Sequence, residues 1–306
     1  MKGPDTRAAM TTLRFFKYHG LGNDFVLLDE ALHGVQTYPD TIAQLARALC
    51  NRSTGIGADG LLVLCFEDGV PRMRITNADG SPAQMCGNGV RCIARHLLER
   101  HGASAGLLTI VTDRGPLAVE VHHDRGAFAA ATVDMGPPIF EAQRVPVALP
   151  EGDRDPLAME VPSEVARLCL RGVSRVMSVL SMGNPHAVIE CDDPESISLG
   201  TLGPAMEHAA MFPEGVNAHF VHVVDSARVR MVTWERGAGA TRACGTGACA
   251  VMVALASRGR IGRRATIRVP GGELLIAWRG SDDHLMMTGP AAFVFEGRTG
   301  PVVLEP

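Results

Sequence analysis

The chain has 306 residues, of which 46% are hydrophobic and 20% are charged, values typical of a globular protein of about two domains and not of a disordered chain. Its formal net charge of −4 at pH 7 disfavours a nucleic-acid-binding protein, which needs a clustered excess of Lys and Arg. Only Lys2 and Lys17 are lysines among the 29 basic residues, so pyridoxal phosphate chemistry would have only two candidate Schiff-base residues.

Neither a secretory segment nor a membrane span is expected. The first residues lack a continuous apolar stretch, and the longest apolar run, residues 248–256, is too short to cross a bilayer. We therefore expect a cytoplasmic protein with reduced thiols. None of the eight cysteines forms a C-x-x-C pair and no H-x-x-x-H occurs, which disfavours a zinc site.

The first half of the chain carries strand, turn and helix signals in a clear order. The predicted elements are a Gly-Asn turn at 22–25, a strand at 26–29, a glycine-rich turn at 86–89, a helix at 90–101, and strands at 107–112 and 117–121.

The second half repeats this order, because CGNG at 86–89 returns as CGTG at 244–247, an offset of 158 residues. The corresponding predicted elements are a Gly-Asn turn at 183–186, a strand at 187–190, a helix at 248–258, and strands at 266–269 and 274–278. Between the halves, residues 141–162 are polar and proline-bearing, so we expect mostly loop, and the tail from residue 291 is predicted to return to the first half as a strand.

Matching elements on both sides of two cysteine turns indicate an internal duplication. The predicted fold class is α+β, with two similar domains of short strands around a central helix. We expect one domain to span residues 13–131 plus 289–306 and the other to span residues 132–288.

Cys86 and Cys244 occupy the same position in the two halves, each in a glycine-rich turn before a predicted helix. Amides at a helix N-terminus bind a carboxylate, and the same positive end favours a thiolate over a thiol. If the two helix N-termini converge on one ligand, one thiolate can remove an α-proton while the opposite thiol supplies another. A disulfide between the two cysteines is an alternative, and the remaining cysteines are interpreted as small buried hydrophobic residues.

Several polar residues stand in apolar or glycine-rich segments. They are Asn23, Asn77, Asn184, His186, Asn217, Glu235 and Arg236. Asn77 and Glu235 are equivalent in the repeat, since each lies nine residues before its cysteine. Buried amides together with an acid and a guanidinium suit a zwitterionic ligand, whose ammonium and carboxylate groups need defined partners.

The sequence resembles the diaminopimelate epimerase family across nearly its whole length. The motifs that carry the resemblance are HGLGNDF (19–25), GIGADGLL (55–62), NADGS (77–81), MCGNGVRC (85–92), MGNPH (182–186), FPEGVNAHF (212–220), ERGAG (235–239) and ACGTGACA (243–250).

The resemblance implies a role for each of these residues. Cys86 and Cys244 would be the acid/base pair, and amides around Gly87, Asn88, Gly245 and Thr246 would hold the reacting carboxylate. Asn23 and Glu235 would face the reacting ammonium, and Asn77, Asn184, Asn217 and Arg236 would hold the distal amino-acid end. His186 would be a neighbour that tunes a thiol.

The family further implies two pseudosymmetric domains, each a β-barrel-like sheet around a central helix, in a homodimer that needs no cofactor or metal. The expected activity is interconversion of LL- and meso-diaminopimelate, a step toward lysine and peptidoglycan precursors. Two positions depart from the pattern: Gly60 stands where many relatives carry glutamine, and Ala240 where they often carry glutamate. The N-terminal twelve residues lie outside the resemblance, and we expect them to be disordered.

Two other functions remain open at this point. One is a cofactor-free racemase of the same fold that acts on proline or another small acid, although a smaller substrate would leave the distal polar residues unpaired at a cost of roughly 1–3 kcal/mol per group. The other is a redox-sensing thiol protein without catalytic activity, which would exchange no α-proton.

Overall fold

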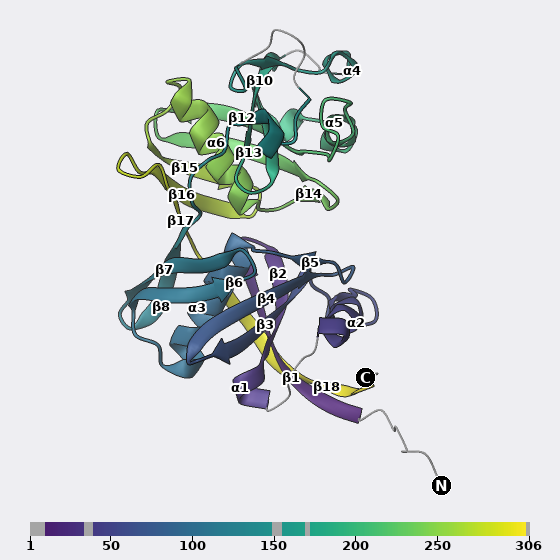
Figure 1. Ribbon diagram of the computed structural model, residues 1–306, viewed down its shortest axis with the longest axis vertical. Coiled ribbons are helices and arrows are strands. Elements are labelled where there is room, and N and C mark those ends of the chain that lie inside the picture. Colours follow the sequence, from purple (N-terminus) through teal and green to yellow (C-terminus); the bar gives the residue numbers. More distant parts are fainter. Residues whose placement is uncertain (1–9, 34–38, 149–154, 169–171, 304–306) are drawn as a thin grey trace. The chain divides into compact units, whose positions relative to one another are not determined.

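Two units account for the described residues of the computed structural model, which are 10–33, 39–148, 155–168 and 172–303 (Figure 1). Unit 1 comprises residues 1–131 and 290–306, and unit 2 comprises residues 132–289. The chain therefore passes between the units twice, at Ala131–Thr132 and at Gly289–Pro290. None of the helices in the described ranges has the length and apolar character needed to span a membrane.

Unit 1 combines hydrogen-bonded strands with one central helix, α3. Its elements are β1 (Met10–Gly20), β2 (Asn23–Asp29), α1 (Glu30–His33), α2 (Pro39–Cys50), β3 (Gly60–Glu67), β4 (Val70–Asn77), β5 (Pro82–Ala83), α3 (Gly87–His101), β6 (Gly106–Thr112), β7 (Gly115–Asp124), β8 (Ala127–Asp134, which runs into unit 2) and β18 (Ala292–Val303).

The strands of unit 1 pair in the order β18–β1–β2–β3–β4–β6–β7. Pairing is parallel between β2 and β3 and between β4 and β6, and antiparallel elsewhere. A two-residue turn with Leu21 and Gly22 both at positive φ joins β1 to β2 and sets Asn23 at the start of β2.

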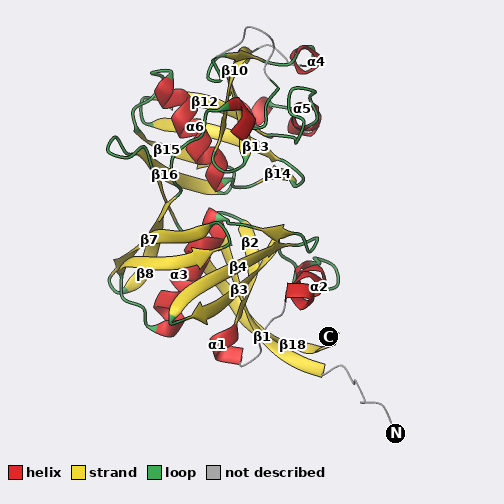
Figure 2. Ribbon diagram, in the orientation of Figure 1, coloured by secondary structure: helices red, strands yellow, loops and turns green. Residues whose placement is uncertain are grey.

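Side chains alternate between the two faces of this sheet. Leu13, Phe15, Val26 and Leu61 pack on the side covered by α2. The opposite face lies around α3 (Figure 2). Residues Gly87 to Ala94 of this helix are all buried. The sheet is therefore covered by helices on both faces.

Unit 2 repeats the architecture. Its elements are η1 (Ala142–Arg144), β9 (Met159–Glu160), α4 (Ser163–Ala166), β10 (Val173–Ser181), β11 (Pro185–Cys191), η2 (Pro194–Ser196), α5 (Leu199–Glu207), β12 (Asn217–Asp225), β13 (Arg228–Glu235), β14 (Gly239–Thr241), α6 (Gly245–Ser257), β15 (Arg264–Val269), β16 (Gly272–Trp278) and β17 (Leu285–Gly289).

The pairing order β9–β10–β11–β12–β13–β15–β16–β17 has its parallel pairs at β11–β12 and β13–β15, as unit 1 has them at β2–β3 and β4–β6. The central helix α6 contacts β10, β11, β12, β15, β16 and β17. Its sequence GTGACAVMVALAS is apolar on all sides, as expected for a helix surrounded by strands.

The α+β class and the duplicated order of elements are confirmed. The predicted helices correspond to α3 and α6, the predicted strand in the tail is β18, and residues 141–162 contain only η1 and β9 within the described ranges. The N-terminal twelve residues were expected to be disordered. That expectation is wrong for residues 10–12, which pair with residues 301–303 in β18, and residues 1–9 lie outside the described residues.

Candidate active site

The two repeat cysteines are the N-cap residues of the two central helices. Cys86 precedes α3 with φ −142° and ψ 116°, and Cys244 precedes α6 with φ −118° and ψ 108°. Both are extended conformations that turn the chain from a strand into the first helical turn. Neither helix has an acidic residue in its first turn or a capping bond from the cysteine side chain, so each N-terminus keeps a positive field for an anion.

Glycine at the third position of each helix lets the helix end sit close to the sheet. A Cβ on Gly89 would approach Leu62 of β3 to 3.0 Å, and a Cβ on Gly247 would approach the ring of His219 of β12 to 2.4 Å. These close approaches fix the depth at which each cysteine lies in its unit.

Cys86 is partly exposed and lies beside two asparagines. Its Sγ is 3.8 Å from Oδ1 of Asn23, which begins β2. Asn88 donates from Nδ2 to the same Oδ1 at 3.0 Å. Three of the residues predicted for the site therefore come together in unit 1.

Cys244 has a different environment. It is 3% exposed, its Sγ lies 3.7 Å from Oγ1 of Thr246, and Glu235 at the end of β13 is its acidic neighbour. Burial raises the pKa of the Cys244 thiol well above its ordinary value, and the charge of Glu235 raises it further. Burial therefore opposes the thiolate that the N-terminus of α6 would favour at Cys244.

The predicted asparagines of unit 2 lie on neighbouring strands. Asn217, which is 3% exposed, donates from Nδ2 to the Pro185 carbonyl at 2.7 Å and accepts the Arg236 backbone N–H at 3.0 Å. The Arg236 guanidinium is exposed and donates to the Glu214 carbonyl at 2.8 Å. Asn217 thus holds the turn that carries Arg236.

His186 is fully buried and both of its ring nitrogens have partners. Nε2 lies 2.9 Å from Oδ1 of Asn184, and Nδ1 lies 2.8 Å from Nε2 of His219, whose Nδ1 is 2.9 Å from Oγ1 of Thr233. Burial lowers the pKa of His186 well below its ordinary value and lowers that of His219 to about 3. Two neutral rings between an amide oxygen and a hydroxyl imply that His186 donates to Asn184.

Asn77 ends β4, at the position that Glu235 occupies in β13. Its Nδ2 donates to Oγ of Ser81 at 2.9 Å, and the residue is exposed. The structure therefore assigns Asn23, Asn77, Cys86, Gly87 and Asn88 to unit 1 and the remaining predicted residues to unit 2, each near the N-terminal end of a central helix or the end of a strand beside it.

A family model described as diaminopimelate epimerase matches residues 15–141 and 178–294, which include both N-cap cysteines. The chain belongs to the diaminopimelate epimerase family. Family membership makes it an isomerase that acts on a small molecule.

Curated relatives extend over the whole family domain. The chain is 42% identical to the diaminopimelate epimerase of Desulfitobacterium hafniense over 93% of its own length and 97% of the relative's. It is 44% identical to the diaminopimelate epimerase of Acaryochloris marina, over 93% and 98% of the two chains.

Solved structures of much lower identity share the fold. A phenazine biosynthesis protein of the PhzF family from Enterococcus faecalis matches with a TM-score of 0.69 at 13% identity, covering 94% of this chain and 99% of that one. A hydroxyproline epimerase from Agrobacterium vitis matches with a TM-score of 0.64 at 16% identity, covering 98% and 94%.

Sequence reasoning gave no role to three residues that shape this epimerase-family site. Asp59, inside the GIGADGLL motif, bonds to Asn23, and His219, inside FPEGVNAHF, bonds to His186. Glu207 of α5 accepts from Trp234 Nε1 at 2.6 Å and from the Gly237 backbone at 2.8 Å, which braces the turn after β13. Asp59 and His219 lie inside family motifs, and this was the sequence signal that could have identified them. Nothing in the neighbouring sequence identifies Glu207.

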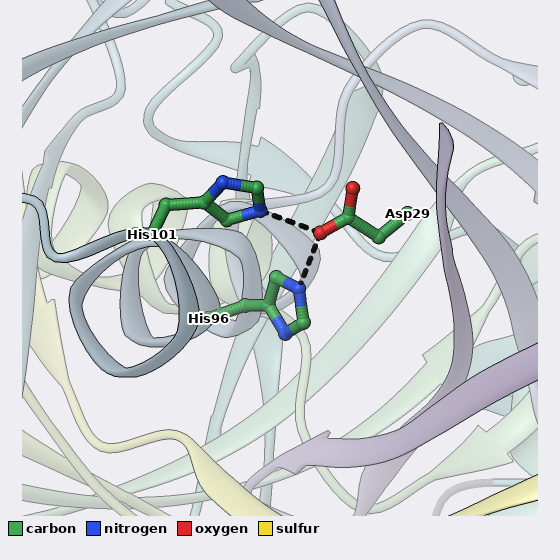
Figure 3. Close-up of side chains that lie close together, drawn as sticks. All are labelled: Asp29, His96 and His101. Carbon is green, nitrogen blue, oxygen red and sulfur yellow. Dashed lines mark hydrogen bonds and ion pairs between the residues drawn. The ribbon is translucent and has the colours of Figure 1, made fainter. Parts of the chain in front are cut away.

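Asp29, His96 and His101 are the group in the described part of the chain whose ligand atoms lie within 4.8 Å of one another (Figure 3). His96 Nε2 and His101 Nε2 lie 2.8 Å and 2.6 Å from the same carboxylate oxygen, Asp29 Oδ2. These are hydrogen-bond distances, and Asp29 Oδ1 also accepts the Ala31 backbone N–H. The geometry therefore fits a hydrogen-bonded clamp between α3 and β2 better than a metal centre.

The clamp is consistent with an ionised, buried carboxylate. Burial raises the pKa of Asp29, but the two histidine hydrogen bonds outweigh it and leave the pKa below its ordinary value. Burial lowers the pKa of His96, whose Nδ1 lies 3.0 Å from the Tyr18 hydroxyl. The three atoms that point toward one another in Figure 3, Asp29 Oδ2, His96 Nε2 and His101 Nε2, are thus joined by hydrogen bonds.

The two departures from the family pattern lie in different surroundings. A Cβ on Gly60 would come to 3.0 Å from the Thr76 carbonyl oxygen, so glycine fits a tight contact between β3 and β4. Ala240 is exposed on β14, opposite Trp234.

Proposed function

We propose that this chain interconverts LL- and meso-2,6-diaminopimelate by proton transfer between the substrate α-carbon and two cysteines, Cys86 and Cys244. The observation that carries the proposal is the equivalent placement of these cysteines at the N-caps of α3 and α6 in a duplicated chain that belongs to the diaminopimelate epimerase family. A carbon centre is inverted when a base and an acid act on opposite faces, and a duplicated pair supplies one group for each face.

The proton transfer needs no redox partner. One cysteine thiolate takes the α-proton, so that an S–H bond forms as the C–H bond breaks, and the electron pair moves onto the substrate carboxylate. The other cysteine thiol then gives its proton to the opposite face of the α-carbon and becomes a thiolate. After one turnover the two cysteines have exchanged protonation states, and the reverse reaction restores them.

The helix N-termini supply the electrostatic part of the reaction. Backbone amides around Gly87, Asn88, Gly245 and Thr246 would hold the reacting carboxylate, which gains negative charge when the α-proton leaves. Because the first amides of a helix are fixed by the helix itself, they need no reorganisation as this charge develops.

The orientation of the polar side chains supports the assignment of the substrate's two ends. Asn184 accepts from His186 through Oδ1, so its Nδ2 hydrogens can donate, and Asn217 needs only one of its two amide hydrogens for Pro185. Together with the Arg236 guanidinium they form a donor set suited to the distal carboxylate. The carboxylate of Glu235 and Oδ1 of Asn23 are acceptors suited to the reacting ammonium, and Asn77 would add a contact to the distal end.

The proposal includes the biological setting that the family implies: a homodimer in the cytoplasm, acting in lysine and peptidoglycan precursor synthesis without a cofactor. Size-exclusion chromatography with light scattering of the full chain tests the dimer. A monomeric mass at micromolar concentration would remove that part of the proposal and leave the reaction chemistry standing.

The decisive experiment follows the α-proton of LL-diaminopimelate by proton NMR in D₂O. We expect the wild-type protein to exchange this proton and form the meso isomer, and Cys86→Ala and Cys244→Ala each to lose epimerisation while keeping native circular dichroism. Cys191→Ala, at a buried cysteine at the end of β11, is the matched control and should react as wild type. Wild-type turnover by either N-cap variant would exclude that cysteine from the reaction.

A further inference from the structure

A directed chain of hydrogen bonds runs through unit 1 and passes Cys86. It begins at the guanidinium of Arg91, which is fully buried, and ends at the carboxylate of Asp59. Two asparagines, Asn88 and Asn23, lie between these ends. Each link is a hydrogen bond of 2.7–3.0 Å.

The two ends determine which way each amide points. A guanidinium can only donate, so Arg91 Nη2 at 2.7 Å requires the oxygen of Asn88 to face it. Asn88 must then offer Nδ2 to the next link, where Asn23 accepts through Oδ1 at 3.0 Å. Asn23 in turn donates from Nδ2 to Oδ2 of Asp59 at 3.0 Å, and a carboxylate can only accept.

Asp59 is itself held in place from two sides. Its Oδ2 also accepts the Asp24 backbone N–H at 3.0 Å, and its Oδ1 accepts from Arg52 at 2.7 Å. Arg52 bridges to the Asp24 carboxylate at 2.6 Å. Burial raises the pKa of Asp24, but the hydrogen bonds from Arg52 and Lys17 outweigh it and hold the pKa at about 2.

A glycine in β1 lets the backbone come close to this arrangement. A Cβ on Gly20 would lie 3.1 Å from both Arg91 Nη2 and Asn88 Cβ. The strand β1 thus approaches the first part of the chain of bonds closely, and the turn after Gly20 delivers Asn23 to the next link. Arg91 and Asn88 thus lie on α3 and Asn23 on β2, and Asp59 lies in the bend directly before β3.

From this geometry we infer that Asp59 is a positioning residue for the reaction at Cys86: by accepting from Nδ2 of Asn23 it keeps Oδ1 of Asn23 facing the Cys86 sulfur. The inference rests on the proposed function, since it assumes that Cys86 transfers a proton. It adds a residue that touches neither the substrate nor the sulfur and acts through Asn23.

The orientation has a chemical consequence. An amide oxygen beside the sulfur accepts from the S–H group and disfavours the thiolate, whereas an amide nitrogen in the same place would donate to the thiolate and favour it. Asp59 thereby stabilises the protonated thiol of Cys86, the form that Cys86 takes after it has removed the α-proton and from which it returns a proton in the reverse reaction.

The test replaces Asp59 by asparagine, which has nearly the same shape but a single oxygen. That oxygen cannot serve Arg52 and the Asn23 side chain at once, so the orientation of Asn23 is then held only from the Asn88 side. The substrate-free protein is treated with iodoacetamide across a pH series, and peptide mass spectrometry reports alkylation of each cysteine. For Asp59→Asn we expect the pH of half-maximal Cys86 alkylation to fall by about one unit and kcat/KM to fall about tenfold.

Asp113→Asn is the matched control. Asp113 forms an ion pair with Arg72 at 2.8 Å and its side chain is 45% exposed, against 2.7 Å and 42% for Asp59 with Arg52. It lies in the turn between β6 and β7 and contacts no member of the chain of bonds described above. Alkylation of Cys86 and turnover should match wild type, and Cys244 in every sample is an internal reference.

A second variant exchanges the two ends of the Asn23–Asp59 bond. In the double variant Asn23→Asp, Asp59→Asn, residue 23 is a carboxylate, and either of its oxygens can face Cys86. The pH of half-maximal Cys86 alkylation should therefore return to the wild-type value or exceed it. A profile equal to that of Asp59→Asn alone would overturn the inference, as would a wild-type profile in Asp59→Asn. Because alkylation needs no substrate, active Cys86→Ala enzyme would refute the proposed function without changing these profiles.

Discussion

The buried histidines of unit 2 make its stability depend on pH. The register pairs His186 with Asn217 and Val188 with His219, while the equivalent pairs in unit 1 are Phe25 with Gly60 and Leu27 with Leu62. Unit 1 thus places Phe25 and Leu62 where unit 2 places His186 and His219. The double variant His186→Phe with His219→Leu places in unit 2 the two apolar residues that unit 1 has at the equivalent positions.

The expected magnitude follows from proton linkage. Both histidines have folded-state pKa values below the unfolded value of about 6.5, so the unfolded chain binds more protons and stability falls as pH decreases below that value. For a ring that stays neutral in the folded protein, the loss at pH 5.5 relative to pH 8 is about 1.4 kcal/mol, because the unfolded ring is then about tenfold more protonated than neutral. The pair should account for about 3 kcal/mol.

Tryptophan fluorescence gives a reading of unit 2 alone. The chain has two tryptophans, Trp234 and Trp278, and both lie in unit 2. Urea unfolding followed by this signal at pH 8 and pH 5.5 should show a loss of stability in the wild type that exceeds the loss in the double variant by about 3 kcal/mol. The variant is expected to be less stable at both pH values, because Thr233 and Asn184 lose their partners.

The test depends on the change in the free energy of unfolding between pH 8 and pH 5.5, and not on the absolute stability of either protein. Titrating groups of unit 1 such as Asp29 and His96 are the same in both proteins and cancel. An equal loss of stability on acidification in wild type and double variant would refute the argument that His186 and His219 are buried in the neutral form. A variant that does not fold is replaced by His219→Gln, for which about half of the effect is expected.

Two further outcomes are expected. Arg236→Lys should lower kcat/KM for diaminopimelate by about tenfold to a hundredfold in steady-state kinetics, because lysine lacks the planar pair of donors that fits a carboxylate, whereas Arg228→Lys, at an exposed pair with Asp225, should match wild type. Gly247→Ala should lower the urea-unfolding stability of unit 2 by about 1–3 kcal/mol, because its Cβ would lie 2.4 Å from the His219 ring. Gly200→Ala, where a Cβ meets nothing within 4 Å, is the control, and equal stabilities of these two glycine variants would contradict the packing described for α6.

Much of the fold follows from local pattern. The glycine-rich turns, the apolar helices after them and the alternating strands predict α3, α6 and the strands on either side, and their recurrence at an offset of 158 residues predicts two similar units. The same repeat singles out Cys86 and Cys244, because a residue shared by both copies stands out against six other cysteines. These inferences need only information that neighbouring residues carry.

Tertiary structure decided the environments of those residues. The helix N-terminus before which Cys244 stands favours a thiolate, yet burial raises the pKa of its thiol, and burial depends on strands far away in the sequence. The roles inferred for Asp59 and His219 likewise depend on hydrogen bonds across 36 and 33 positions of sequence. Sequence alone determined which residues the duplication placed at the two helix ends, whereas desolvation and the direction of each hydrogen bond arise only when distant strands pack together.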